Sequence, residues 1–94
     1  MDRDALVDSI KTSLDAWNAE IDRMQARARE AEAEARERYD TQLREMKMQR
    51  DRAEEELAKA MKASETAWKD MGEGMTDAWT AIAEGFRKAS GRFG

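Results

Sequence analysis

The sequence contains no cysteine and no histidine. Without cysteine the chain has no disulfide framework and no thiol chemistry. Without histidine it lacks the commonest zinc ligand and the usual general base of enzymes. Carboxylates are the remaining candidates for metal ligands or catalytic groups. The side chains of the acidic run Glu54-Glu55-Glu56 point in directions about 100° apart on a helix, which indicates a solvated surface. We therefore expect no catalytic residue, no metal site and no cofactor.

Proline is also absent, and all five glycines come after Met71. Between Asp4 and Met71 nothing normally ends a helix, since Asn18 is a weak turn former on its own. The strong helix formers Ala, Glu, Arg, Lys and Met dominate the composition. The sequence therefore predicts an all-α protein with one long, nearly continuous helix of about 100 Å. We divide it into a heptad coiled-coil helix over residues 1–66 and an amphipathic helix over residues 67–94.

Large apolar side chains are few. Leu, Ile, Val and Phe together supply ten residues, whereas alanine alone supplies 17. This composition is too poor in large side chains for the core of a compact monomer and is typical of a coiled coil or long helix. The long helix is therefore expected to find its partners in other chains.

The charge balance is slightly acidic, with a formal net charge of −4 and a sequence pI of about 4.9. This balance argues against nucleic acid as a partner. The opening Met1-Asp2-Arg3-Asp4 is charged and no long apolar region follows it, so we expect no signal peptide. No apolar run approaches the roughly 18 residues that span a bilayer. We expect a cytoplasmic protein, with a peripheral position at the inner face of a membrane as the alternative.

Apolar residues recur at alternating spacings of three and four from Val7 onward, as in a coiled-coil seam. Between Ala35 and Met46 the spacing becomes 4, 4, 3, a stutter that locally unwinds a left-handed supercoil. A helix lying on a globular core would give a similar pattern, but no other segment is expected to supply such a core. The predicted seam consists of Val7, Ile10, Leu14, Trp17, Ile21, Met24, Ala28, Ala31, Ala35, Tyr39, Leu43, Met46, Ala53 and Leu57.

The C-terminal third contains an 11-residue repeat, in which residues 67–77 align with residues 78–88. Eleven residues over three turns keep one face of a helix nearly parallel to its axis. The opposite face is mixed in charge, whereas lipid-binding helices are rich in Lys and Arg there, so packing on another helix is favoured over a lipid surface. The predicted apolar stripe consists of Trp68, Met71, Met75, Trp79, Ile82, Phe86 and Phe93.

Two glycines interrupt this repeat. Gly72 and Gly74 each cost roughly 1 kcal/mol relative to alanine within a helix, which makes them the best hinge candidates. A hinge there would fold residues 75–93 back onto the long helix. The apolar stripe keeps its phase across both glycines, and this favours a continuous helix.

The sequence contains several short motifs along its length: Trp17-Asn18-Ala19-Glu20-Ile21-Asp22, Tyr39, Ala67-Trp68, Gly74, Ala78-Trp79 and Arg92-Phe93. Through them the chain resembles a group of small bacterial coiled-coil proteins of unassigned function, although Asn18 stands where an acid is expected in that group. The resemblance implies a bacterial, helical and non-enzymatic protein and brings no catalytic residues. The C-terminal repeat is also similar to apolipoprotein-type lipid-binding repeats, in period alone.

The sequence is compatible with two functions. The first is a homo-oligomeric coiled-coil scaffold or interaction protein, a dimer to tetramer in which antiparallel pairing is preferred. The second is a peripheral membrane or lipid-binding protein that acts through the C-terminal stripe. The expected partners are the chain itself, another helical protein or a membrane surface, and an enzyme is the least favoured class.

Overall fold

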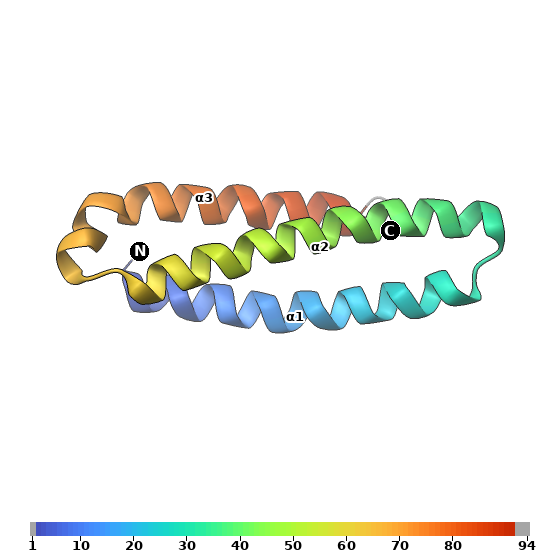
Figure 1. Ribbon diagram of the computed structural model, residues 1–94, viewed down its shortest axis with the longest axis horizontal. Coiled ribbons are helices and arrows are strands. Elements are labelled where there is room, and N and C mark those ends of the chain that lie inside the picture. The colour runs from blue at the N-terminus through green and yellow to red at the C-terminus, as the bar shows by residue number, and fades with distance from the viewer. Residues whose placement is uncertain (1, 92–94) are drawn as a thin grey trace.

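The computed structural model describes residues 2–91, which form three α-helices and contain no strand. The helices are α1 (Arg3–Glu30), α2 (Ala33–Lys62) and α3 (Glu65–Gly91). The all-α prediction is confirmed. The single long helix is wrong, because the chain reverses direction twice between Asp4 and Met71 (Figure 1).

The three helices form an elongated bundle with extents of 53 × 17 × 17 Å. Each turn reverses the chain, so α2 is antiparallel to both neighbours and α1 and α3 are parallel (Figure 1). Helix α2 packs extensively against α1 and α3, whereas α1 and α3 meet each other much less. Helix α3 ends level with Gln42, so α1 and α2 extend beyond it as a two-helix arm that ends in the first turn.

The first turn consists of Ala31 and Glu32, in a stretch where the sequence has no helix breaker. Ala31 has φ −77° and ψ 151°, and Glu32 has φ −68° and ψ 162°. These are extended conformations that any L-residue adopts, so the turn needs neither glycine nor proline. The guanidinium of Arg36 donates hydrogen bonds to the carbonyls of Ala28, Arg29 and Ala31 at 3.3, 3.4 and 3.2 Å. Arg36 therefore adds hydrogen bonds to carbonyls at the end of α1, where the carbonyl of Ala28 also accepts from the backbone N–H of Ala31 at 3.3 Å.

The second turn lies at Ala63 and Ser64. Ala63 is again extended, with φ −70° and ψ 130°. The hydroxyl of Ser64 accepts a hydrogen bond from the backbone N–H of Ala67 at 3.1 Å, the usual role of a serine before a helix. Arg3 at the start of α1 donates to the carbonyl of Ala63. This contact ties the second turn to the N-terminal end of the chain.

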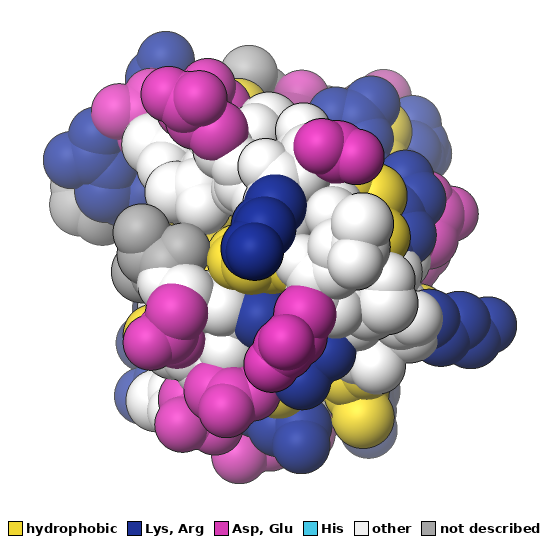
Figure 2. Space-filling view, turned by 90° about the vertical axis from the view of Figure 1, so that its left-hand side faces the viewer, with side chains coloured by type: hydrophobic (Ala, Val, Ile, Leu, Met, Phe, Trp, Pro, Cys, Tyr) yellow, Lys and Arg dark blue, Asp and Glu magenta, His cyan; other side chains and the backbone are white. Residues whose placement is uncertain are grey.

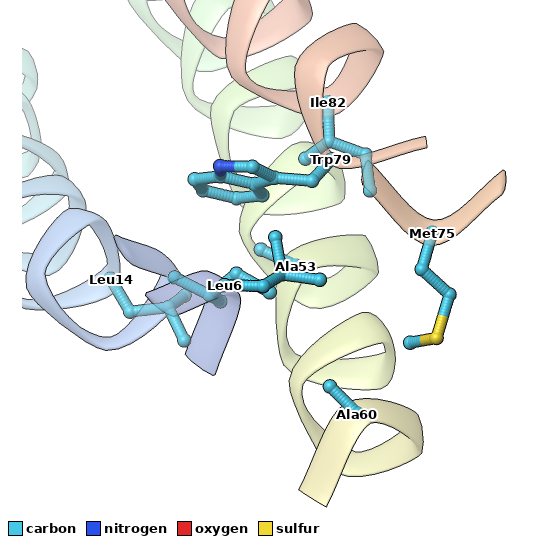
Figure 3. Close-up of a cluster of buried hydrophobic side chains, with 8 residues drawn as sticks. Leu6, Leu14, Ala53, Ala60, Met75, Trp79 and Ile82 are labelled. Atoms are coloured by element: carbon cyan, nitrogen blue, oxygen red, sulfur yellow. The ribbon is translucent and has the colours of Figure 1, made fainter. Parts of the chain in front are cut away.

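The core lies within this one chain, contrary to the expectation that it needs other chains. In one cluster, Leu6, Ile10 and Leu14 of α1 pack together with Met75, Trp79 and Ile82 of α3. Figure 3 shows Leu6 and Leu14 with the three α3 residues and the alanines of α2. On α2 the facing residues are the alanines Ala53 and Ala60, both 0% exposed. Small side chains let helix axes approach closely. A modest number of large residues therefore fills this core. A second cluster toward the other end contains Ile21, Met24, Ala28, Leu43, Met46, Phe86 and Ala89.

The proposed hinge at Gly72 and Gly74 is absent, because both glycines lie inside α3 and neither has a positive φ. The prediction of a continuous helix across them is confirmed. The chain folds back at Ala63 and Ser64 instead, eight residues before Gly72. The two glycines differ in their surroundings. A Cβ on Gly72 would lie 2.8 Å from Cε2 of the Trp68 ring, whereas a Cβ on Gly74 would have no neighbour within 4 Å.

Candidate functional site

The residues of the predicted seam face the interior of the bundle. Eight are buried: Ile10, Leu14, Ile21, Met24, Ala28, Leu43, Met46 and Ala53. Six are half-buried: Val7, Trp17, Ala31, Ala35, Tyr39 and Leu57. The heptad pattern therefore located the apolar face of α1 and α2 correctly. The surface that covers this face comes from the same chain.

The residues of the predicted C-terminal stripe mostly share this interior. Met75, Trp79, Ile82 and Phe86 are buried, and Trp68 is half-buried. Met71 is 38% exposed and lies at the edge of the stripe. Phe93 lies outside the described residues. The boundary drawn between residues 66 and 67 falls within the first turn of α3.

A stack of three aromatic rings joins α1 to α3 where the two helices otherwise meet little. Trp79 and Phe86 are two helical turns apart on α3. The ring of Trp17 stacks on both, with centroid distances of 5.3 Å to Trp79 and 4.2 Å to Phe86. Such offset or stacked pairs add roughly 0.5–1.5 kcal/mol each beyond the area they bury. The sequence placed all three residues on apolar faces without indicating that they touch.

Two glutamines with buried side-chain carbonyls, Gln42 and Gln49, carry no signal in the sequence that sets them apart. Gln42 is 1% exposed, and its amide nitrogen donates to the carbonyl of Ser90 at 3.0 Å. The side-chain carbonyls of Gln42 and Gln49 are buried without a hydrogen-bond partner. Only their seven-residue separation hints that they share a face, because glutamine is equally common on exposed helices. Buried apolar residues missing from the predicted set are Leu6, Ala60, Ala63 and Ala89.

A groove runs between the parallel helices α1 and α3. In its middle part, Ser13, Ala16, Trp17 and Glu20 of α1 face Ala83, Phe86, Arg87 and Ser90 of α3 around an open cavity of about 370 Å³. Trp17, which is half-buried, is among its lining residues. Small side chains such as Ser13 and Ala83 line the facing sides.

Another hollow lies between the N-terminal ends of the same two helices. There Asp2, Arg3 and Asp4 face Glu65, Trp68 and Lys69 around a second cavity of about 420 Å³. A third hollow, of about 390 Å³, begins at the same Trp68 and Lys69 and follows α3 past Gly72, Glu73, Thr76 and Asp77. On α3 the lining residues recur every three or four positions, so they share one helical face. Figure 2 views the molecule from this end, where acidic and basic side chains are mixed and hydrophobic ones show only in small patches.

Another cavity, of about 590 Å³, lies along the two-helix arm between α1 and α2. It is lined by Gln25, Ala28, Arg29, Arg36, Asp40, Leu43 and Lys47. Arg36 is already engaged with the carbonyls at the end of α1. Among residues 2–91, no three acidic side chains are grouped so that they could hold a metal ion.

Comparison with family models, with curated proteins and with solved structures finds no match to this chain. The resemblance to small bacterial coiled-coil proteins therefore stays a prediction. Within the described part of the chain, no helix is long and apolar enough to cross a membrane.

Proposed function

We propose that this chain is a non-catalytic helical interaction protein that associates with copies of itself. The observation that carries the proposal is the open groove between α1 and α3. Trp17 lines this groove and Trp68 lines the hollow at the N-terminal ends of the same helices; both tryptophans are half-buried, and further helical surface could cover them. Large amphipathic rings of this kind often supply the central contacts of protein interfaces.

The fold supports association through helix packing. Helix bundles are closed when every helix packs on two neighbours, as in four-helix bundles. Here α2 has two neighbours, whereas α1 and α3 each have one extensive neighbour and a groove on the other side. An added helical surface would complete the packing of both.

The alternative function, lipid binding through the C-terminal stripe, has less support. Met75, Trp79, Ile82 and Phe86 are buried against the other two helices, so the bundle would have to open before these side chains could reach a bilayer. Opening exposes the rest of the core as well, at a cost of roughly 25 cal/mol for each Å² of apolar surface. Surface groups of both signs around the groove also lack the Lys and Arg excess of lipid-binding helices.

Sedimentation equilibrium of the full chain across the micromolar range tests the proposal. We expect the mass of a dimer or of a larger oligomer up to a tetramer. A single-chain mass throughout that range would contradict self-association. Flotation with anionic vesicles at low salt is the parallel measurement, and strong binding would favour the lipid alternative.

A further inference from the structure

We infer that two copies of this chain exchange α3, with α2 and α3 of each copy joined into one continuous helix through Ala63 and Ser64. The inference rests on the proposed self-association and names the segment that passes between the copies. It uses the surface of α1 and α2 that α3 covers in the single chain, and so it is a route to association separate from the groove. Three features carry it: the second turn, the register of α2 against α3, and the phase of their apolar faces.

The second turn contains nothing that prevents a helix from passing through it. Ala63 and Ser64 are neither glycine nor proline, and alanine has the highest helix propensity of all residues. Two side-chain hydrogen bonds fix the turn: the hydroxyl of Ser64 accepts from the N–H of Ala67, and Arg3 donates to the carbonyl of Ala63. Straightening gives up both bonds and gains the regular backbone bonds of a helix across the junction. The first turn is held by three hydrogen bonds of Arg36 instead.

The register between α2 and α3 is one that two straight helices reproduce. The amide nitrogen of Gln42 donates to the carbonyl of Ser90 at 3.0 Å. Gln49 packs on Gly85, where a Cβ would lie 2.7 Å from its amide nitrogen. The midpoints of these two antiparallel pairs are residues 66 and 67, just beyond the turn.

This common midpoint defines the symmetry of the exchanged dimer. When α2 and α3 form one straight helix, a two-fold axis at residues 66–67 places Gln42 against Ser90 of the partner subunit. The same axis places Gln49 against Gly85 of the partner subunit. Contacts made within one chain are then made again between two chains, as in domain-swapped dimers.

The apolar faces of α2 and α3 keep the same phase across the junction. Successive residues of a helix are turned by about 100°. On one continuous helix, the buried apolar residues of α2 and α3 fall within an arc of about 100°. They are Leu43, Met46, Ala53 and Ala60 of α2 and Met75, Trp79, Ile82, Phe86 and Ala89 of α3. The straight helix therefore presents one unbroken apolar face to the other copy.

Each half of the exchanged dimer has the composition of the single-chain bundle. It combines α1 and α2 of one copy with α3 of the other, so Trp17 stacks on the partner's Trp79 and the partner's Phe86. The groove between α1 and α3 is retained, with its two walls from different copies. Because the core is the same in both forms, the conformation of the second turn and the protein concentration decide which form is populated.

Proline substitutions at the two turns test which one opens. Glu65 is the first residue of α3, where the N–H has no helical partner, so Glu65→Pro suits the closed turn. In a continuous helix the same proline removes a backbone hydrogen bond and clashes with the preceding turn. Ala33→Pro is the matched control, because Ala33 is the first residue of α2 after the other turn.

Both variants are compared with the unaltered chain by sedimentation equilibrium, with circular dichroism to confirm that each remains helical. We expect Glu65→Pro to weaken the dimer by about a hundredfold or more and Ala33→Pro to leave it nearly unchanged. Equal effects of the two prolines on the dimer would overturn the exchange of α3.

Disulfide trapping separates exchange from association through another surface. The chain has no cysteine of its own, so introduced thiols react only with each other. A Cβ on Gly85 would lie 2.8 Å from Cδ of Gln49, so cysteines in the variant Gln49→Cys/Gly85→Cys are within reach of a disulfide. Oxidation at a concentration where the dimer forms should give a covalent dimer on a gel without reductant. Gln49→Cys/Gly74→Cys is the matched control and should form no such bond, because a Cβ on Gly74 has no neighbour within 4 Å.

The outcomes distinguish this inference from the proposed function. A chain that sediments as a dimer without the disulfide between copies would overturn the exchange and leave self-association standing. A single-chain mass of the unaltered protein would overturn both.

Discussion

Replacing Gly72 by alanine is expected to destabilise the bundle, although the same change two residues later is expected to stabilise it. Both glycines lie within α3, so both substitutions gain up to about 1 kcal/mol of helix propensity. The new Cβ at position 74 would meet nothing within 4 Å. We therefore expect Gly74→Ala to raise the free energy of unfolding by roughly 0.4–1 kcal/mol.

At position 72 the propensity gain is opposed by a collision. The added Cβ would lie 2.8 Å from Cε2 of Trp68 and 3.1 Å from Cδ2 and Cζ2 of the same ring. A rigid indole cannot bend away at its tip as a long flexible chain can, so the whole ring has to swing off the helix. Overpacking of this kind typically costs about 1–3 kcal/mol. The net expectation for Gly72→Ala is a loss of about 1 kcal/mol, which lowers Tm by roughly 4–8 °C in a domain of this size.

The two variants are compared by thermal and urea unfolding followed by circular dichroism. A double-mutant cycle then isolates the cause, because in a Trp68→Ala background the ring is gone and Gly72→Ala should stabilise as Gly74→Ala does. The predicted collision with the Trp68 ring is refuted if Gly72→Ala stabilises the intact chain as much as Gly74→Ala. It is refuted as well if the loss at position 72 persists without the indole.

Two further substitutions test the contacts that hold the helices together. Trp17→Ala removes the ring that stacks on Trp79 and Phe86 and should lower the free energy of unfolding in urea by about 3 kcal/mol. Trp17→Phe should lower it clearly less, because it keeps a ring in the stack. A loss below about 1 kcal/mol for Trp17→Ala would contradict a stabilising role of the stack. Arg36→Ala removes the hydrogen bonds to three carbonyls at the end of α1 and should cost about 1 kcal/mol, with faster amide exchange around the first turn. Arg38→Ala on the same helix, where Arg38 is exposed, is the matched control and should stay within about 0.5 kcal/mol of the unaltered chain.

The helical periodicity located the core face with good accuracy. None of the 14 predicted seam residues is exposed, and the C-terminal stripe is buried at Met75, Trp79, Ile82 and Phe86. This succeeds because the spacing of apolar residues reports a local property, namely which side of a helix avoids water. The same periodicity also predicted that the helix continues through Gly72 and Gly74, where the low helix propensity of glycine by itself suggested a hinge.

The location of the turns was not predictable in the same way. Ala31, Glu32 and Ala63 adopt extended backbone conformations that need no special residue, so the absence of glycine and proline was no guide. Side-chain contacts around each turn stabilise it instead. Arg3 reaches Ala63 across sixty residues of sequence, and Arg36 caps α1 only because α2 returns alongside it.

The sequence by itself therefore determined the helical class, the apolar faces of the helices and the lack of cysteine and histidine chemistry. Only the tertiary structure decided which surface covers those faces. It placed Trp17 against both Trp79 and Phe86, and it left a groove between α1 and α3. The physical reason is that apolar burial is non-directional: an apolar stripe gains free energy against any matching surface, from its own chain or from another. Whether the same chain or another covers the stripe depends on where the chain reverses, and in this protein it reverses between α1 and α2 and again between α2 and α3.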